Sequence, residues 1–374
     1  MMNDQAATGE LQTHSLIGDG NEKWLFSLSL DLSVFLGSAV ASLILLAVGY
    51  QLGILDSDSP EWTWITAVLL IDVAHVWSTS FRVYFDKEEF RRRLALYLLV
   101  PISGYITGVA LYSEGELLFW RVLALIAVFH FVRQQYGWVN LYRRKLGEKD
   151  DWTWWIDSAA IYLATVYPLA FWVTQLPRNF QWFVQDDFVA APAIVETVLF
   201  PVYVIALSAY AGKSLYLYWT TGFLNPGKDI VLATTALCWY VGIVFFNSDY
   251  AFTVTNVIIH GVPYFALIWF YAKFRRETSG RLYRSLSSNW LVFLATLWAL
   301  AYVEELFWHR GVWNEREWLF GTKWQLDSLK MYLVPLLAVP QLTHYILDGF
   351  IWRRKNNPNF RLFELFGANA DRYS

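Results

Sequence analysis

The sequence predicts an all-α, polytopic integral membrane protein, and three observations lead to this fold class. Hydrophobic residues make up 56% of the 374 residues, charged residues only 16%, and the mean hydropathy is +0.32, outside the usual range of soluble domains. The chain contains about ten apolar stretches of roughly 20 residues, the length that crosses a bilayer as a helix. Its 21 Trp and 22 Tyr residues suit a protein with two membrane interfaces.

The apolar stretches follow one another with short polar connections. In chain order we expect spans at residues 31–54, 62–84, 94–112, 117–140, 152–174, 192–219, 229–247, 251–273, 289–307 and 329–352. Interfacial tryptophans mark the start of the second and fifth spans, and the boundary between the seventh and eighth is the least sharply marked. Residues 23–354 are therefore expected to form a single transmembrane bundle.

The two ends of the chain are predicted to be polar tails. Residues 1–22 lack the charged, apolar and small-residue regions of a cleavable signal peptide, so the first span is expected to act as the insertion signal. Residues 355–374 are predicted to form a second tail. With a single cysteine, Cys238, the chain has no intrachain disulfide, and a cysteine-based metal site is not expected.

The distribution of basic residues predicts the orientation. If the N-terminus is cytoplasmic, 22 of the 29 Lys and Arg residues fall in cytoplasmic segments, six fall in external ones, and Arg133 lies within a span. Basic residues accumulate on the cytoplasmic side of membrane proteins. The sequence therefore predicts ten helices with both termini in the cytoplasm, as in a bacterial inner (plasma) membrane protein.

Four histidines lie inside predicted spans, and each has a polar residue one helical turn away. The pairs are Asp72 with His75, His130 with Gln134, Asn256 with His260, and His344 with Asp348. Residues three or four apart share one face of a helix. Ionisable side chains within a membrane are costly unless they are paired, hydrated or bound to a ligand, so these positions are candidate functional sites.

The predicted topology places the four histidines together. They fall on the second, fourth, eighth and tenth spans, which all run in the same direction. At 1.5 Å of rise per residue, each lies roughly 12 to 20 Å from the cytoplasmic end of its span. We therefore expect one layer of imidazoles on the cytoplasmic side of the membrane midplane.

Four imidazoles with carboxylates nearby form a ligand set typical of iron, zinc or copper. We predict His75, His130, His260 and His344 as metal ligands for one or two ions, most suitably iron. Asp72 and Asp348 are predicted as further ligands or as bases, and Gln134 and Asn256 as weak ligands or as groups that fix the histidine tautomers. The alternative is that each pair is a helix-packing device.

Arg133 lies one helical turn from His130, before the basic cluster that ends this span. An arginine at that depth is expected to pair with a buried carboxylate or to bind an anionic substrate group. Gly261 and Pro263 are expected to loosen or kink the helix that follows His260. Gly349 is expected to admit a neighbouring helix.

The remaining histidines are expected to lie away from this layer. His14 falls in the N-terminal tail. Residues 301–321 carry mixed charges and three tryptophans, which indicates an interfacial amphipathic helix on the external side. Glu304 and His309 are therefore expected to lie at the opposite face of the membrane from the metal site, within a surface lid.

These features favour a membrane metalloenzyme: an iron-dependent oxygenase, hydroxylase or desaturase that acts on a lipid or isoprenoid and draws on an electron-donor protein. As a histidine-rich multipass protein, the chain resembles the membrane fatty-acid desaturases and the bacterial carotenoid-cleaving membrane dioxygenases. The paired HxxHH boxes of the desaturases are absent from it. No pattern indicates a nucleic-acid partner.

Two other classes remain open at this stage. A haem-binding redox protein would use pairs of these histidines as axial ligands, but its macrocycle needs small neighbouring residues, and Gly261 is the one suggestive position. A transporter or proton pathway would use buried His, Asp and Arg as a relay. The absence of an obvious inverted repeat and the clustering at one depth favour chemistry over transport.

Overall fold

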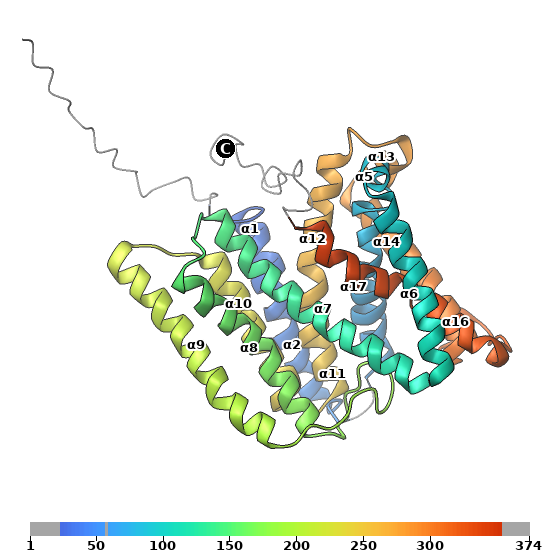
Figure 1. Ribbon diagram of the computed structural model, residues 1–374, viewed down its shortest axis with the longest axis horizontal. Coiled ribbons are helices and arrows are strands. Elements are labelled where there is room, and N and C mark those ends of the chain that lie inside the picture. Colours follow the sequence, from blue (N-terminus) through green and yellow to red (C-terminus); the bar gives the residue numbers. More distant parts are fainter. Residues whose placement is uncertain (1–22, 57–58, 354–374) are drawn as a thin grey trace, which may run out of the picture.

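The computed structural model describes residues 23–56 and 59–353, and helices are the only regular secondary structure in these residues (Figure 1). The predicted polar tails, together with His14, lie outside the described residues. The all-α fold class is therefore confirmed for the part of the chain that carries the predicted spans.

Eight helical segments are long and apolar enough to cross a membrane, which supports a multi-pass membrane protein. In chain order they are Leu28–Leu52 (α1, η1 and α2), Glu61–Arg82 (α3, η2 and α4), Leu94–Glu114 (α6), Trp152–Thr174 (α8), Ile194–Thr221 (α9), Pro226–Phe245 (α10 and η3), Asp249–Arg275 (α11, η4 and α12) and Trp290–Trp313 (α14 and η5). Each overlaps one predicted span, although the ninth span continues past residue 307 to Trp313.

The individual helices within the composite segments have the following bounds: α1 Leu28–Asp31, α2 Ser38–Leu52, α3 Glu61–Thr63, α4 Ala74–Arg82, α10 Pro226–Trp239, α11 Asp249–Phe252, α12 Ile258–Arg275 and α14 Trp290–Trp308. Wider π-helical turns form η1 (Leu32–Gly37), η2 (Trp64–Val73), η3 (Tyr240–Phe245), η4 (Thr253–Val257) and η5 (His309–Trp313).

Two of the ten predicted spans are not among these eight segments. The fourth, 117–140, lies within α7 (Glu116–Lys145), a continuous helix of 30 residues. The tenth, 329–352, is interrupted at Ala338, which separates α16 (Lys330–Leu337) from α17 (Val339–Ile351). Pro340 explains this break, because its ring clashes with the carbonyl of the preceding turn. The predicted count of ten is thus not supported.

Short helices connect the long ones. They are α5 (Lys87–Arg92), α13 (Arg281–Leu286), α15 (Glu317–Phe320) and η6 (Asp327–Leu329). Asp86 caps α5 by accepting from two backbone N–H groups and also pairs with Arg275 at 2.7 Å. Burial alone would raise the pKa of Asp86, but the hydrogen bonds from Arg275 and Tyr271 outweigh it and hold that pKa below its usual range.

The segment Asp249–Arg275 is the centre of the bundle, since 89% of its most apolar stretch is buried inside the protein. The peripheral helices are α6 and α9, with only 11% and 17% buried, and they lie on opposite sides of α12 (Figure 1). Exposure of their large apolar side chains, such as Ile106 and Ile205, to water would be unfavourable, whereas contact with lipid suits them.

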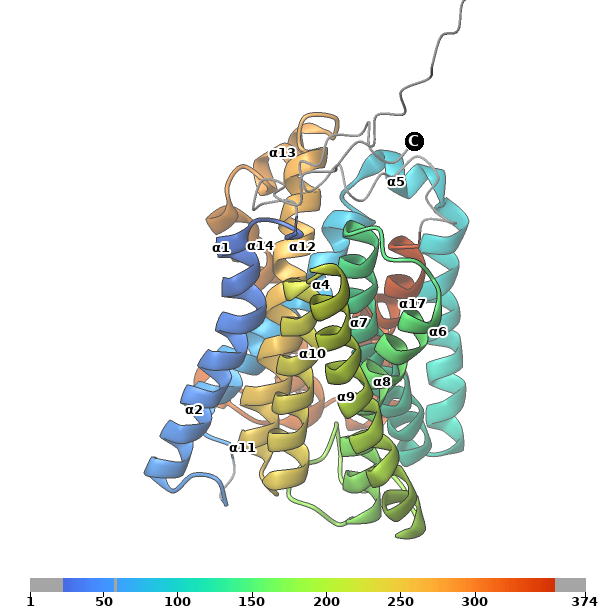
Figure 2. The same ribbon diagram turned by 90° about the vertical axis from the view of Figure 1, so that its left-hand side faces the viewer.

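α16 and α17 are both held against α6 by close packing. A Cβ at Gly104 would lie 2.6 Å from Leu342, and one at Gly108 would lie 3.0 Å from Pro335. Small residues at this spacing allow two helices to approach in a membrane. This contact fixes the interrupted α16–α17 pair beside the long helices in Figure 2.

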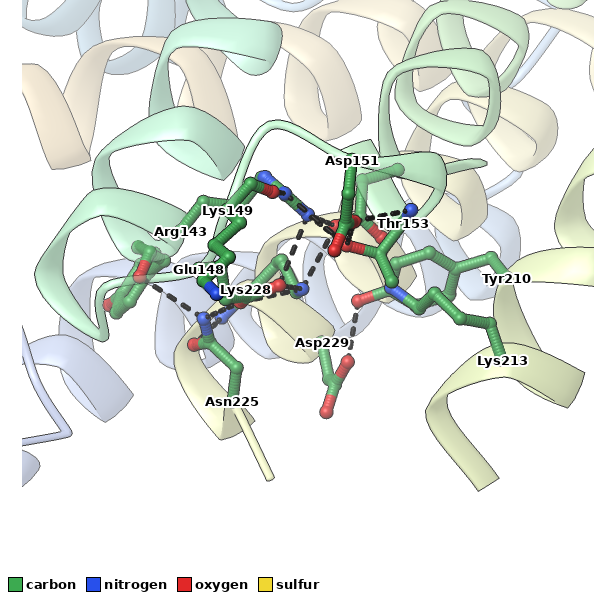
Figure 3. A network of polar contacts seen from close by, with 12 residues as sticks. Arg143, Glu148, Lys149, Asp151, Thr153, Tyr210, Lys213, Asn225, Lys228 and Asp229 are labelled. Carbon is green, nitrogen blue, oxygen red and sulfur yellow. Dashed lines mark hydrogen bonds and ion pairs between the residues drawn. The ribbon is translucent and has the colours of Figure 1, made fainter. Parts of the chain in front are cut away.

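A buried ion-pair network joins the ends of four helices near the α7–α8 turn (Figure 3). Asp157 of α8 is fully buried and accepts from Arg143 of α7, Lys213 of α9 and, at 2.9 Å, Lys228 of α10. Glu148 accepts from Lys228 at 2.6 Å. Asp229 at the start of α10 also interacts with Lys213 and Lys228, so three carboxylates balance the three cations, and the network braces α7 to α10.

Replacing Asp157 with alanine is expected to destabilise the protein strongly, because it leaves three buried cations with too few carboxylates. Breaking a buried pair on one side costs about 3–5 kcal/mol. Asp151→Ala, which removes only the N-cap of α8, should cost about 1 kcal/mol. Thermal unfolding of both variants in mild detergent measures the difference, and equal losses would refute the bracing role.

Candidate metal centre

The four predicted histidines converge in the middle of the bundle. His75 lies on α4, His130 on α7, His260 on α12 and His344 on α17. All four side chains are buried, with at most 3% of their surface exposed. Helices that are distant in sequence thus bring their imidazoles to one point, as the predicted topology required.

The imidazoles meet through their Nε2 atoms. Nε2 of His75 lies 3.1 Å from Nε2 of His260, and Nε2 of His344 lies 3.1 Å from Nε2 of His130. Ring centroids of His75 and His344 are 4.8 Å apart. The potential ligand atoms of His75, His130 and His344 all lie within 4.8 Å of one another, and His260 joins them through its contact with His75.

These distances suit ligands of one metal ion. Two imidazole nitrogens bound at about 2.0–2.1 Å lie about 3.0 Å apart at a right angle and about 3.4 Å apart at the tetrahedral angle. The two contacts of 3.1 Å fall between these values. The buried group of His75, His130 and His344 can therefore hold a metal ion, with His260 in contact with His75, and the geometry does not determine which metal.

Hydrogen bonds to the Nδ1 atoms orient the imidazole rings so that their Nε2 atoms face the centre of the cluster. Nδ1 of His75 bonds to the backbone carbonyl of Asp72, which can only accept, so Nδ1 carries the proton and Nε2 keeps its lone pair. Nδ1 of His344 lies 2.6 Å from Oγ1 of Thr79. Partners of this kind fix the tautomer of metal-binding histidines.

Wide π-helical turns precede two of the histidines. η2 ends directly before α4, which carries His75, and η4 ends directly before α12, which carries His260. π-turns are uncommon and occur often at functional sites. Here they rotate the following helix relative to a regular α-helical register. This rotation turns the side chains of His75 and His260 toward each other at the place where the two helices pack closely.

Gly261 permits the close approach of α12 to the η2–α4 segment. A Cβ at this position would lie 2.5 Å from Cγ2 of Ile71 and 3.7 Å from Cβ of His75. α12 continues through Gly261 and Pro263 to Arg275, so the expected loosening of the helix after His260 is not found. The glycine instead serves the approach of α12 to the η2–α4 segment.

The two predicted aspartates lie beside the histidines and make no contact within the inner cluster. Oδ2 of Asp348 lies 3.9 Å from Nδ1 of His130, and Oδ1 of Asp72 lies 3.5 Å from Nδ1 of His75. Tyr264 donates to Asp348 at 2.7 Å. The carboxylates thus flank the outer nitrogens, where they can orient and polarise the imidazoles.

Gln134 and Asn256 differ in their surroundings. Both polar atoms of the Gln134 side chain are buried without a hydrogen-bonding partner. Asn256 donates to Oγ1 of Thr255 at 2.9 Å, and its Oδ1 has no partner. Asn256 therefore helps to hold the π-turn η4, whereas Gln134 faces a cavity that also touches His130.

Arg133 forms no ion pair within the described part of the chain. Its guanidinium donates to the hydroxyl of Tyr162 and lies over the ring of Tyr136, 4.7 Å from the centroid. Of the two expected roles, pairing with a buried carboxylate is not found. Arg133 lines the same cavity as His130 and Gln134.

The predicted separation of Glu304 from the metal site is wrong. Oε2 of Glu304 accepts from the indole N–H of Trp77 at 2.6 Å, and Trp77 lies on α4 two residues after His75. Glu305 is also buried, and its Oε2 lies 3.3 Å from Nε2 of His309. The end of α14 therefore reaches into the bundle, and these residues are not a surface lid.

Three further residues beside the histidines were not predicted. Thr79 follows His75 and Tyr264 follows His260 by four residues, and Tyr345 follows His344 directly. The hydroxyls of Thr79 and Tyr264 lie 3.3 Å apart, and the ring of Tyr345 lies 5.0 Å from that of His130. The helical spacing that linked His344 to Asp348 would have found the first two.

Comparisons with known proteins yielded no relative, because no protein-family model, curated protein or solved structure matches this chain.

Enlarging Gly261 is expected to separate His260 from His75. Gly261→Val should lower metal affinity at least tenfold, because the added atoms meet Ile71 and push α12 away from η2. Gly212→Val on the peripheral helix α9, where a Cβ would meet nothing within 4 Å, is the matched control. Competition with a chelator measures both affinities, and unchanged affinity in Gly261→Val would contradict the role given to this contact.

Proposed function

We propose that the protein is an integral membrane metalloenzyme in which His75, His130, His260 and His344 bind a transition metal. The observation that carries this proposal is the convergence of four buried imidazoles through their Nε2 atoms. A bare contact between nitrogen lone pairs at 3.1 Å is unfavourable unless a proton or a metal ion lies between them. A metal ion is the simplest single partner that would satisfy the lone pairs of four such nitrogens in an apolar bundle.

Iron is the metal that this ligand set suits best, with one or two ions as open possibilities and zinc or copper as alternatives. Imidazole donors with carboxylates nearby are typical of non-haem iron sites that keep open positions for dioxygen. When bound, the iron would supply the redox chemistry. We therefore place the protein among oxygenases, hydroxylases or desaturases, and an electron-donor protein would complete the reaction.

The chain's own residues would bind the metal, orient its histidine ligands and exclude water from the site. Asp72 and Asp348 flank His75 and His130 and would hold charge and protons next to the site. The surrounding apolar side chains would exclude water. A cavity of about 670 Å³ reaches His130, a volume typical of a small-molecule site, so a hydrophobic substrate from the bilayer is a fitting partner.

The orientation completes the proposal. We place the N-terminus and the ends of α4, α7 and α12 on the cytoplasmic side of an inner (plasma) membrane, because the basic clusters gather there. In this orientation the α5 and α13 end of the bundle in Figure 2 faces the cytoplasm. An electron donor would then approach from that end.

A haem is disfavoured by the same geometry. Axial histidines lie on opposite faces of a macrocycle, which occupies the plane between them. Here the ring centroid of His130 lies 4.5 Å from that of His344 and 5.2 Å from that of His260. The neighbouring imidazoles thus fill the space that a porphyrin would need.

A proton pathway is the second candidate function, and one observation favours it. Buried titratable groups continue from the histidines toward the far end of α14: Asp72 beside His75, then Glu304, Glu305 and His309. Such a series can carry protons between the centre and the opposite face of the membrane. It would serve either a transporter or a metalloenzyme that consumes protons.

Elemental analysis of the purified protein, together with its visible spectrum, tests the proposal. We expect one or two iron atoms per chain and no Soret band. Alanine at any of the four histidines should remove most of the metal, because each supplies one ligand, whereas His309→Ala and His14→Ala should retain it. Metal-free protein that stays empty after reconstitution would contradict the proposal and favour the proton pathway.

Chemical rescue separates a lost ligand from a lost fold. In His344→Gly, added imidazole can occupy the vacated space and is expected to restore metal binding. If imidazole has no effect while the variant melts at the wild-type temperature, His344 is not a ligand.

A further inference from the structure

A second set of polar side chains lies one helical turn beyond the four histidines. Each histidine is followed by a polar residue four positions later, and residues at this spacing share one face of a helix. The four residues are Thr79, Gln134, Tyr264 and Asp348. The Gln134 side chain has no hydrogen-bonding partner in the described residues, whereas the other three are joined to one another. The joined residues therefore link α4, α12 and α17 beside the candidate metal centre.

Their hydrogen bonds form a chain from Asp348 to His344. The hydroxyl of Tyr264 lies 2.7 Å from Oδ1 of Asp348 and 3.3 Å from Oγ1 of Thr79. Oγ1 of Thr79 lies in turn 2.6 Å from Nδ1 of His344. Thr79 and Tyr264 are buried, with 3% and 1% of their surfaces exposed, so water does not compete for these bonds. The chain leaves α17 at Asp348 and returns to the same helix at His344.

The number of protons fixes the direction of this chain. A carboxylate accepts and cannot donate, so the one hydroxyl proton of Tyr264 goes to Asp348. The Tyr264 oxygen then accepts from Thr79, and the Thr79 oxygen accepts from Nδ1 of His344. Nδ1 of His344 therefore carries a proton, which leaves the lone pair on Nε2. That Nε2 is the atom that lies 3.1 Å from Nε2 of His130.

A second donor holds Asp348 in its role as the final acceptor. The indole N–H of Trp352 donates to the same Oδ1 at 2.7 Å. Hydrogen bonds that donate to a carboxylate stabilise its ionised form. The ionised form is the one that the direction of the chain requires.

The chain begins at the wall of a cavity. Asp348, Tyr264 and Trp352 line the cavity of about 670 Å³ that also reaches His130. Gly349, the next residue on α17, lines it too, and a Cβ there would meet nothing within 4 Å. The expectation that Gly349 admits a neighbouring helix is therefore wrong. A small side chain can be added at this position without disturbing Asp348.

From these observations we infer that Tyr264 is a positioning residue that fixes the tautomer of His344 through Thr79. Without the Tyr264 hydroxyl, the Thr79 proton loses its acceptor and is free to turn to Nδ1 of His344. His344 then carries its own proton on Nε2, the nitrogen that a metal needs. The inference rests on the proposed function and specifies how the chain prepares one ligand of that site.

Nitrogen-15 NMR of the histidine-labelled protein in mild detergent, after removal of metal with a chelator, tests the tautomer directly. We expect His344 to have a protonated Nδ1 and an unprotonated Nε2 in the wild type. In Tyr264→Phe we expect Nε2 to become protonated. The spectrum of His344→Ala identifies the signals. A wild type with the proton on Nε2, or the same tautomer in both proteins, would overturn the inference.

Zinc affinity, measured by competition with a chelator, tests the consequence for the site. Tyr264→Phe and Thr79→Val should each bind zinc about 10- to 100-fold more weakly, as is typical when an outer partner of a metal-binding histidine is lost. Thr79→Ser keeps the hydroxyl and should restore the affinity. Wild-type affinity in both Tyr264→Phe and Thr79→Val, or a Thr79→Ser variant as weak as Thr79→Val, would refute the role of the chain.

Two control variants separate this role from a general effect on packing. Tyr283→Phe removes the hydroxyl of another buried tyrosine, which has no hydrogen-bonding partner in the described residues. Gly349→Ala adds a methyl group beside Asp348 in open space. Both should bind zinc as the wild type does. Equal losses of affinity in Tyr283→Phe and Tyr264→Phe would contradict the positioning role.

The two measurements together separate this inference from the proposed function. If the wild type binds zinc but Tyr264→Phe and Thr79→Val bind it as tightly, only the positioning inference fails. If the wild type binds no metal, yet His344 carries its proton on Nδ1 and transfers it to Nε2 in Tyr264→Phe, the chain sets the tautomer and only the metalloenzyme proposal fails.

Discussion

The close contact of four imidazoles in the apolar centre of the bundle is the constraint on which the rest of the structure depends. Buried polar groups must be paired, and here each inner nitrogen faces another at 3.1 Å. To reach this arrangement, α12 approaches the η2–α4 segment at Gly261, and π-turns precede His75 and His260. The helix packing is thus organised around the site, and α17, which begins after the break at Ala338, carries the fourth imidazole, that of His344.

Charges are arranged in two separate systems around this centre. The network in which Asp157 and Glu148 pair with Arg143, Lys213 and Lys228, with Asp229 close by, is internally balanced and braces the α7–α10 ends. The carboxylates of Asp72 and Asp348 lie next to the histidines, and neither has a lysine or arginine as an ion-pair partner in the described residues. Uncompensated carboxylates beside imidazoles favour a cation at the centre, whereas the balanced network favours a structural role.

The sequence predicted the helical fold, eight of the spans and the group of four histidines, because apolar length and helical spacing are local properties that a chain displays directly. It did not predict Glu304 beside Trp77, because the distance between α14 and α4 depends on how deeply a helix end enters the bundle. The role of Gly349 was also misjudged, since a glycine that admits a helix and one that lines a cavity look alike in sequence. The break at Pro340 and the resulting count of spans likewise depended on tertiary packing around α16 and α17. The roles of Asp72, Asp348, Gln134 and Asn256 remain predictions.

X-ray absorption spectroscopy at the metal edge of the purified protein tests the central claim most directly, because it counts the ligands of the metal ion itself. The account predicts nitrogen donors at about 2.0–2.1 Å, with outer-shell scattering from three or four imidazole rings that decreases in His344→Ala. A porphyrin pattern, two or fewer imidazoles, or a spectrum that His344→Ala leaves unchanged would contradict it.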